Sequence, residues 1–116
     1  MYSREYPGIL YRGKRVGWYA REIDGKWCLP IRYLIETAGG SVTWNSRDFS
    51  LDIRLNDVDF RYKDEKLRWT DAEGTHQVFV EDTNTDYEVA YFPKDVCEKA
   101  FGLKTQLTYE LPEGKE

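Results

Sequence analysis

One segment of the chain reads Leu29-Pro30-Ile31-Arg32-Tyr33-Leu34-Ile35-Glu36-Thr37-Ala38-Gly39-Gly40. Pro30 suits the first turn of a helix, because the N–H that proline lacks would have no partner within the helix at that point. The two glycines favour the left-handed backbone that closes a helix. The apolar residues that follow the proline fall on one helical face: Ile31, Leu34, Ile35 and Ala38. We therefore predict a short amphipathic helix that packs against another layer of the protein.

Strand patterns occupy the sequence after this helix. Apolar and polar residues alternate from Phe49 to Leu55, and this alternation is typical of a strand with one buried face. We expect that face to carry Phe49, Leu51, Ile53 and Leu55, with the segment around Val42 and Trp44 as the hairpin partner. Three further alternating segments follow, and turn signals separate them. The turn signals are Asn56-Asp57, Lys63-Asp64-Glu65 and Asp71-Ala72-Glu73-Gly74. These hairpins predict an antiparallel β-meander.

The helical segment has a fainter counterpart later in the chain. Tyr91-Phe92-Pro93 stands 63 residues after Cys28-Leu29-Pro30, and Gly102 follows it at the same offset from Gly39. The recurrence predicts a second short helix, followed by a strand around Leu107-Thr108-Tyr109. A duplicated strand-helix-strand unit explains the pattern, and chance similarity between two short segments is the alternative.

The N-terminal part carries two tight-turn signals, Arg12-Gly13 and Asp24-Gly25, each between strand-like residues. No linker divides the sequence. We expect an N-terminal arm at residues 1–8, a single domain at residues 9–110 and a flexible tail at residues 111–116. The fold class that follows is α+β and β-rich, with antiparallel hairpins and two short helices.

Composition excludes several classes of protein. The 116 residues are 41% hydrophobic and 33% charged, which is ordinary for a globular domain. A net charge of −4 argues against nucleic acid as a partner, since such binding draws on clustered Lys and Arg. No run of residues approaches the roughly 20 apolar residues of a membrane span, so no membrane partner is expected. The N-terminus lacks the apolar core of a signal peptide, and we expect a cytoplasmic protein.

No constellation of residues indicates catalysis or a cofactor. Cys28 and Cys97 have no second cysteine or histidine at metal-binding or redox spacing, and we expect two buried free thiols. His76 is the only histidine, so no metal site is predicted. Glu36 follows Arg32 by four residues, and a surface ion pair accounts for it better than a catalytic acid. We therefore expect a protein that is not an enzyme and has no cofactor.

Ordered motifs between residues 9 and 55 resemble the copper amine oxidase N-terminal-like (stalk) family. The motifs that carry the resemblance are Arg12-Gly13-Lys14, Asp24-Gly25-Lys26, Leu29-Pro30-Ile31-Arg32, Ile35-Glu36-Thr37-Ala38-Gly39-Gly40 and Val42-Thr43-Trp44-Asn45. The resemblance implies an α+β fold and neither copper binding nor oxidase chemistry. Stalk domains are typically exported as parts of larger envelope proteins, whereas this sequence shows no export signal. The expectation is a copy with another use, such as a phage or mobile-element protein that inhibits a host protein.

Binding is the function that the residues favour. Tyr, Trp and Arg, the types enriched at interface hot spots, are concentrated in the first 27 residues. Our candidate binding residues are Tyr11, Arg15, Trp18, Tyr19 and Arg21. In the other interpretation, about half of these aromatic residues, Trp27 in particular, belong to the core.

We expect a protein partner, and open sheet edges favour a homodimer as well. The alternative function is a small-molecule or nucleotide-sequestering protein with an aromatic pocket at an oligomer interface.

Overall fold

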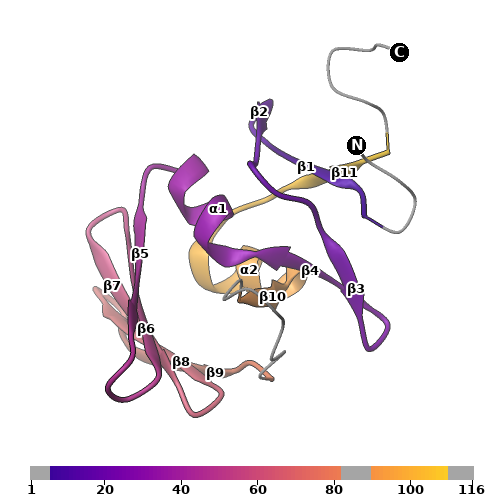
Figure 1. Cartoon of the computed structure of the whole chain (residues 1–116). Coiled ribbons are helices and arrows are strands. Elements are labelled where there is room, and N and C mark those ends of the chain that lie inside the picture. Colours follow the sequence, from indigo (N-terminus) through magenta and orange to yellow (C-terminus); the bar gives the residue numbers. More distant parts are fainter. Residues whose placement is uncertain (1–5, 82–89, 110–116) are drawn as a thin grey trace.

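A computed structural model describes residues 6–81 and 90–109. Within these residues the chain forms two helices and three antiparallel sheets (Figure 1). The elements are, in chain order, β1 (Gly8–Tyr11), β2 (Lys14–Arg15), β3 (Arg21–Ile23), β4 (Lys26–Pro30), α1 (Ile31–Thr37), β5 (Ser41–Asn45), β6 (Ser50–Leu55), β7 (Val58–Lys63), β8 (Lys66–Asp71), β9 (Gly74–Phe79), β10 (Tyr91–Pro93), α2 (Lys94–Phe101) and β11 (Gln106–Thr108). The α+β class and its β-rich character are confirmed.

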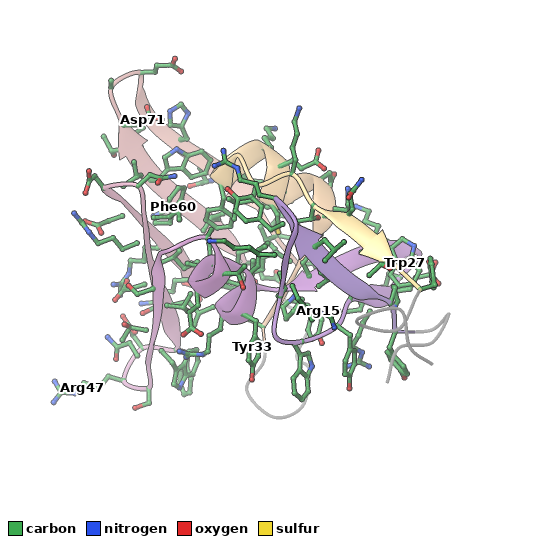
Figure 2. The ribbon with its side chains drawn as sticks, turned by 90° about the horizontal axis from the view of Figure 1, so that it is seen from above. Arg15, Trp27, Tyr33, Arg47, Phe60 and Asp71 are labelled. Carbon is green, nitrogen blue, oxygen red and sulfur yellow. The ribbon has the colours of Figure 1, made fainter. Side chains whose placement is uncertain are left out.

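The predicted meander is a five-stranded sheet in the order β5-β6-β7-β8-β9. Two of its turns have left-handed residues at both central positions: φ is 53° and 66° at Asn56 and Asp57, and 53° and 64° at Asp64 and Glu65. Such turns match the right-handed twist of the strands that they join. The hairpin ends therefore alternate between the two ends of the sheet, where Figure 2 shows Arg47 and Asp71.

The expectation that Phe49 is buried is wrong. Phe49 is 72% exposed, because it lies in the turn before β6 with a φ of 58°, and strand geometry begins only at Ser50. The left-handed backbone breaks the alternation by which Leu51 and Ile53 reach the core. The Phe49 ring instead contacts Trp44, with 6.1 Å between the ring centroids.

Helix α1 forms where the sequence predicted it. Pro30 precedes its first residue, and Gly39 follows it with a φ of 95°. Three apolar residues of its inner face are fully buried: Ile31, Leu34 and Ile35. Figure 1 shows α1 and α2 between the five-stranded sheet and strands β1 to β3, so the helices fill the space that the sheet alone would leave open.

Two three-stranded sheets close the other side of the fold, in the orders β11-β1-β2 and β10-β4-β3. Both predicted turns, at Arg12-Gly13 and Asp24-Gly25, join paired strands. Strand β10 pairs with β4, with Phe92 opposite Leu29, and β11 pairs with β1, with Leu107 opposite Ile9.

The order strand, helix, strand recurs at the expected offset, with Pro93 before α2 and Gly102 after it. The pairing partners nevertheless differ, since β5 pairs with β6 and β11 with β1. Duplication therefore stays a prediction.

A single apolar core joins the layers. The rings of Phe60 and Phe101 meet edge to face at 4.7 Å, and Phe92 stacks on Phe101 at 6.3 Å. Within the described residues, neither helix is long and apolar enough to cross a membrane. The expected arm and tail fall largely on residues 1–5 and 110–116, which lie outside the described residues, while Pro7 is buried and Gly8 begins β1.

Candidate binding surface

Four aromatic side chains from three parts of the chain meet at the surface; we call Tyr6, Trp18, Tyr19 and Tyr33 the aromatic stack. The ring of Trp18 is nearly parallel to the ring of Tyr19 and to that of Tyr33 on α1, with centroid distances of 5.1 and 5.5 Å and interplanar angles of 17° and 15°. Tyr6 meets Tyr19 at 5.2 Å in a tilted arrangement. Stacked and tilted rings of this kind are favourable beyond their buried area.

The segment that carries Trp18 is fixed at both of its ends. The N–H of Val16 donates to the carbonyl of Ile9 at 3.0 Å, and the N–H of Ala20 donates to the carbonyl of Pro7 at 2.9 Å. The side chains of Val16 and Ala20 are buried. The residues between these anchors are consequently held at the surface, and Trp18 is placed there by the core.

A buried tyrosine supports the stack from below. The hydroxyl of Tyr91 donates to the carbonyl of Tyr19 at 3.2 Å, and the guanidinium of Arg21 lies 5.8 Å from the Tyr91 ring centroid. Burial raises the pKa of Tyr91 to about 12, so its hydroxyl remains a donor even at a pH near the ordinary tyrosine pKa of about 10. Trp18 and Tyr6 still expose 37% and 39% of their surface. The stack is thus supported from within the fold and partly accessible.

The predicted binding residues divide into two groups. Trp18 and Tyr19 belong to the stack, and Arg21 contacts the tyrosine beneath it. Tyr11 and Arg15 lie on the β1–β2 hairpin, where Tyr11 packs partly against the core and the guanidinium of Arg12 lies over its ring at 5.5 Å.

The structure also answers whether the N-terminal aromatic residues are core or surface. Trp27 packs against the core, whereas Trp18 is exposed. Tyr33, which points outward in Figure 2, was not a predicted site residue. Its position on α1, outside the Ile31, Leu34 and Ile35 face, is the sequence signal for its partial exposure, although part of its side chain also packs against the core.

The two cysteines offer no reactive thiolate. Both are free and buried, as predicted. Burial raises the pKa of Cys28 to about 11 and raises that of Cys97 as well. Since the thiolate is the nucleophile, neither side chain is activated at neutral pH. The predicted ion pair on α1 is confirmed, with 3.9 Å between Arg32 Nη1 and Glu36 Oε2.

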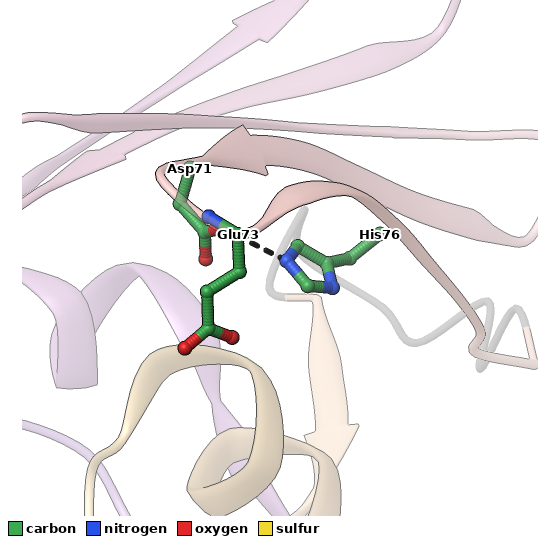
Figure 3. A group of neighbouring side chains, drawn as sticks. All are labelled: Asp71, Glu73 and His76. Carbon is green, nitrogen blue, oxygen red and sulfur yellow. Dashed lines mark hydrogen bonds and ion pairs between the residues drawn. The ribbon is translucent and has the colours of Figure 1, made fainter.

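The β8–β9 hairpin carries a group that sequence reasoning missed. Within the described part of the chain, Asp71, Glu73 and His76 bring their ligand atoms within 4.8 Å of one another (Figure 3). Such atoms are potential ligands of a divalent cation. Asp71 Oδ1, however, already accepts hydrogen bonds from the Glu73 N–H and from His76 Nε2, each at 2.9 Å, and His76 stacks on Trp69. We interpret the group as a brace of the turn.

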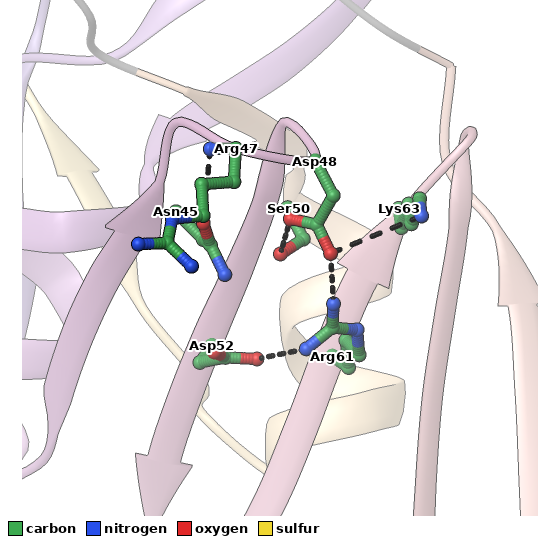
Figure 4. Close-up of polar contacts among 7 residues, drawn as sticks. All are labelled: Asn45, Arg47, Asp48, Ser50, Asp52, Arg61 and Lys63. Carbon is green, nitrogen blue, oxygen red and sulfur yellow. Dashed lines mark hydrogen bonds and ion pairs between the residues drawn. The ribbon is translucent and has the colours of Figure 1, made fainter.

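Charged side chains on the outer face of the sheet pair across strands (Figure 4). Arg61 binds the carboxylates of both Asp48 and Asp52, and the Ser50 hydroxyl donates to Asp48 at 2.7 Å. Lys63 lies 3.8 Å from the same aspartate. Exposed pairs of this kind contribute little to the stability of a protein, because water and salt screen them. The cluster is accounted for as sheet pairing.

No protein-family model, curated protein or solved structure matches the chain. The resemblance to the stalk family therefore stays a prediction that rests on the sequence motifs.

Proposed function

We propose that the chain is a non-catalytic protein-interaction module with a stalk-like α+β fold, and that the aromatic stack is its contact surface. The observation that carries the proposal is the position of Trp18, whose ring stacks against both Tyr19 and Tyr33 and is yet exposed. An exposed Trp with a fixed orientation loses little side-chain entropy when a partner covers it.

The residue types support a protein partner. Trp, Tyr and Arg are enriched among the few residues that dominate binding energy, and they cluster near the centre of interfaces. Here Trp18 and three tyrosines form one cluster at the surface, with Arg21 beside the tyrosine beneath it. An apolar depression on the partner with acidic groups at its rim complements such a surface. If the partner is an enzyme, we propose that binding inhibits it.

Affinity capture from cell lysate, followed by titration with the purified partner, tests the proposal. We expect Trp18→Ala to weaken binding at least tenfold, because loss of a central Trp typically costs about 2 kcal/mol or more. The matched control is Trp44→Ala, which removes a 47% exposed Trp from the five-stranded sheet. Circular dichroism of each variant checks that the fold is retained.

Three results would contradict the proposal. Equal binding by wild type, Trp18→Ala and Tyr19→Ala would exclude the aromatic stack as the contact surface. Turnover of a substrate by the purified chain would place it among enzymes. A small molecule that copurifies with the chain and raises its melting temperature would favour a sequestering protein instead.

A further inference from the structure

Strands β5 and β9 form the two edges of the five-stranded sheet, and within the described part of the chain only the β5 edge is covered by a side chain. The tight turn at Asn56-Asp57 makes Leu55 and Val58 a hydrogen-bonded pair, and hydrogen-bonded and non-hydrogen-bonded pairs alternate along the strands from there. Carried across β6 to β5, this alternation directs the backbone N–H and C=O groups of Val42 and Trp44 away from β6. Arg32 of α1 occupies this edge, where its Nη1 donates to the Val42 carbonyl at 3.0 Å. A guanidinium thus blocks the approach of another strand to β5.

The same alternation fixes the direction of the backbone groups of β9. The tight turn at Asp64-Glu65 makes Lys63 and Lys66 a hydrogen-bonded pair, so the next residue, Leu67, points its N–H and C=O toward β9. The hydrogen bond from the Val80 N–H to the Glu65 carbonyl, at 2.9 Å, agrees with this pattern. Three residues of β9 then direct their backbone groups away from β8: Thr75, Gln77 and Phe79.

Strand β9 carries none of the devices that protect an edge. Its six residues, Gly74 to Phe79, include no Asp, Glu, Lys, Arg or Pro, and its pairing with β8 continues without a bulge. Within residues 6–81 and 90–109, no strand pairs with its outer side. Phe79 is 65% exposed there. An uncharged, regular edge of this length is a template for another strand.

We propose that β9 pairs antiparallel with β9 of a second copy of the chain, about a two-fold axis at Gln77. In this register Gln77 faces Gln77 of the other copy, and Thr75 faces Phe79 of the other copy. All three outward-directed residues then form hydrogen-bonded pairs, side chains of the outer face meet side chains of the outer face, and the two five-stranded sheets become one continuous sheet.

A second copy suits this edge better than an unrelated strand does. The outward-directed residues lie symmetrically about Gln77, so a second copy can pair with all three of them at once. Because β9 is uncharged, two copies oppose no like charges across the interface. The exposed Phe79 ring also gains a neighbour. This inference does not depend on the aromatic stack, which lies on other elements.

Charge substitutions at Gln77 test the axis directly. Sedimentation equilibrium between about 1 μM and about 1 mM covers weak to moderate association. We expect wild type to shift from a 13.7 kDa monomer to a dimer within that range. Gln77→Lys should raise the dimer Kd about tenfold or more, since it opposes two like charges on the axis, and Gln77→Glu should also weaken the dimer. An equimolar mixture of the two variants should recover dimerisation, because Lys then faces Glu.

Thr43→Lys, an outer-face substitution on the blocked edge strand β5, is the matched control and should leave the dimer Kd unchanged. A wild-type chain that stays monomeric over the whole concentration range overturns the proposal. Protection of the β9 amides from hydrogen exchange that does not depend on concentration also overturns it, because another part of the chain would then cover the edge. An unchanged Kd for Gln77→Lys excludes this edge, and a mixture that fails to form heterodimers excludes the register. Trp18→Ala should dimerise normally, which separates this test from that of the aromatic stack.

Discussion

Replacing Gly40 by alanine tests how α1 is joined to the five-stranded sheet. Gly40 lies between the end of the helix and β5, and its N–H donates to the Ile35 carbonyl at 2.8 Å. An alanine Cβ at this position would lie 2.3 Å from the Arg54 carbonyl oxygen, 2.8 Å from Ile35 Cγ2 and 3.1 Å from Leu55 Cδ1. The first of these contacts is with backbone.

The size of the effect follows from what is able to move. Extra methyl groups in packed sites cost about 1–3 kcal/mol when side chains and backbone shift to accept them. Arg54 pairs with Ser41 in the sheet, so its carbonyl cannot retreat without disturbing β5 and β6. We expect Gly40→Ala to lower the free energy of unfolding by about 3 kcal/mol, which is a large part of the typical total of about 5–15 kcal/mol.

The adjacent glycine provides the control. Gly39 has a φ of 95°, and an alanine Cβ there would meet no atom within 4 Å, so Gly39→Ala introduces backbone strain but no clash. Left-handed backbone costs a non-glycine residue about 1–2 kcal/mol. Urea unfolding followed by circular dichroism measures both variants, and the slope m should remain that of wild type. If the free energy of unfolding of Gly40→Ala were equal to or higher than that of Gly39→Ala, the close approach of the helix end to the sheet would be refuted.

Two further predictions concern ionisation. The hydrogen bond from the Ser50 hydroxyl is the main reason that the pKa of Asp48 lies below its ordinary 3.8. Ser50→Ala should therefore raise the pKa of Asp48, which a carbon-13 NMR titration measures. Any stabilisation from the lowered pKa is present above about pH 4 and is lost as the pH falls through the folded-state pKa. Cys28 and Cys97 should react slowly with a thiol reagent at pH 8 until urea unfolds the chain, and rapid labelling of the folded chain would contradict their burial. The free energy of unfolding should fall as the pH rises from 9 toward 11, because the thiols of the unfolded chain ionise at a lower pH than those of the folded chain.

Local signals predicted the elements that depend on neighbouring residues. Pro30 and Gly39 mark the ends of α1, and the turns at Asn56-Asp57 and Asp64-Glu65 define the meander. The alternation from Phe49 misplaced one residue, because a periodic pattern does not show where the turn stops and the strand begins. The backbone conformation of that residue decides its exposure.

Longer-range features were beyond the reach of such signals. The predicted site included Trp18 and Tyr19 on the basis of residue type, but Tyr33 joins them only because α1 packs beside the loop after β2. The brace formed by Asp71 and His76 depends on the register between β8 and β9. The open edge of β9 likewise follows from the order of strands, which local patterns do not determine.

The pairing of β1 with β11 can form only late in synthesis, after most of the chain has been made. The meander is built from consecutive hairpins, and each strand finds its partner within a few residues of leaving the ribosome. Ile9, by contrast, emerges early and waits for Leu107, so nearly the whole described chain is made before β1 gains that neighbour. Until then β1 pairs only with β2, and its other edge stays open to association with other chains.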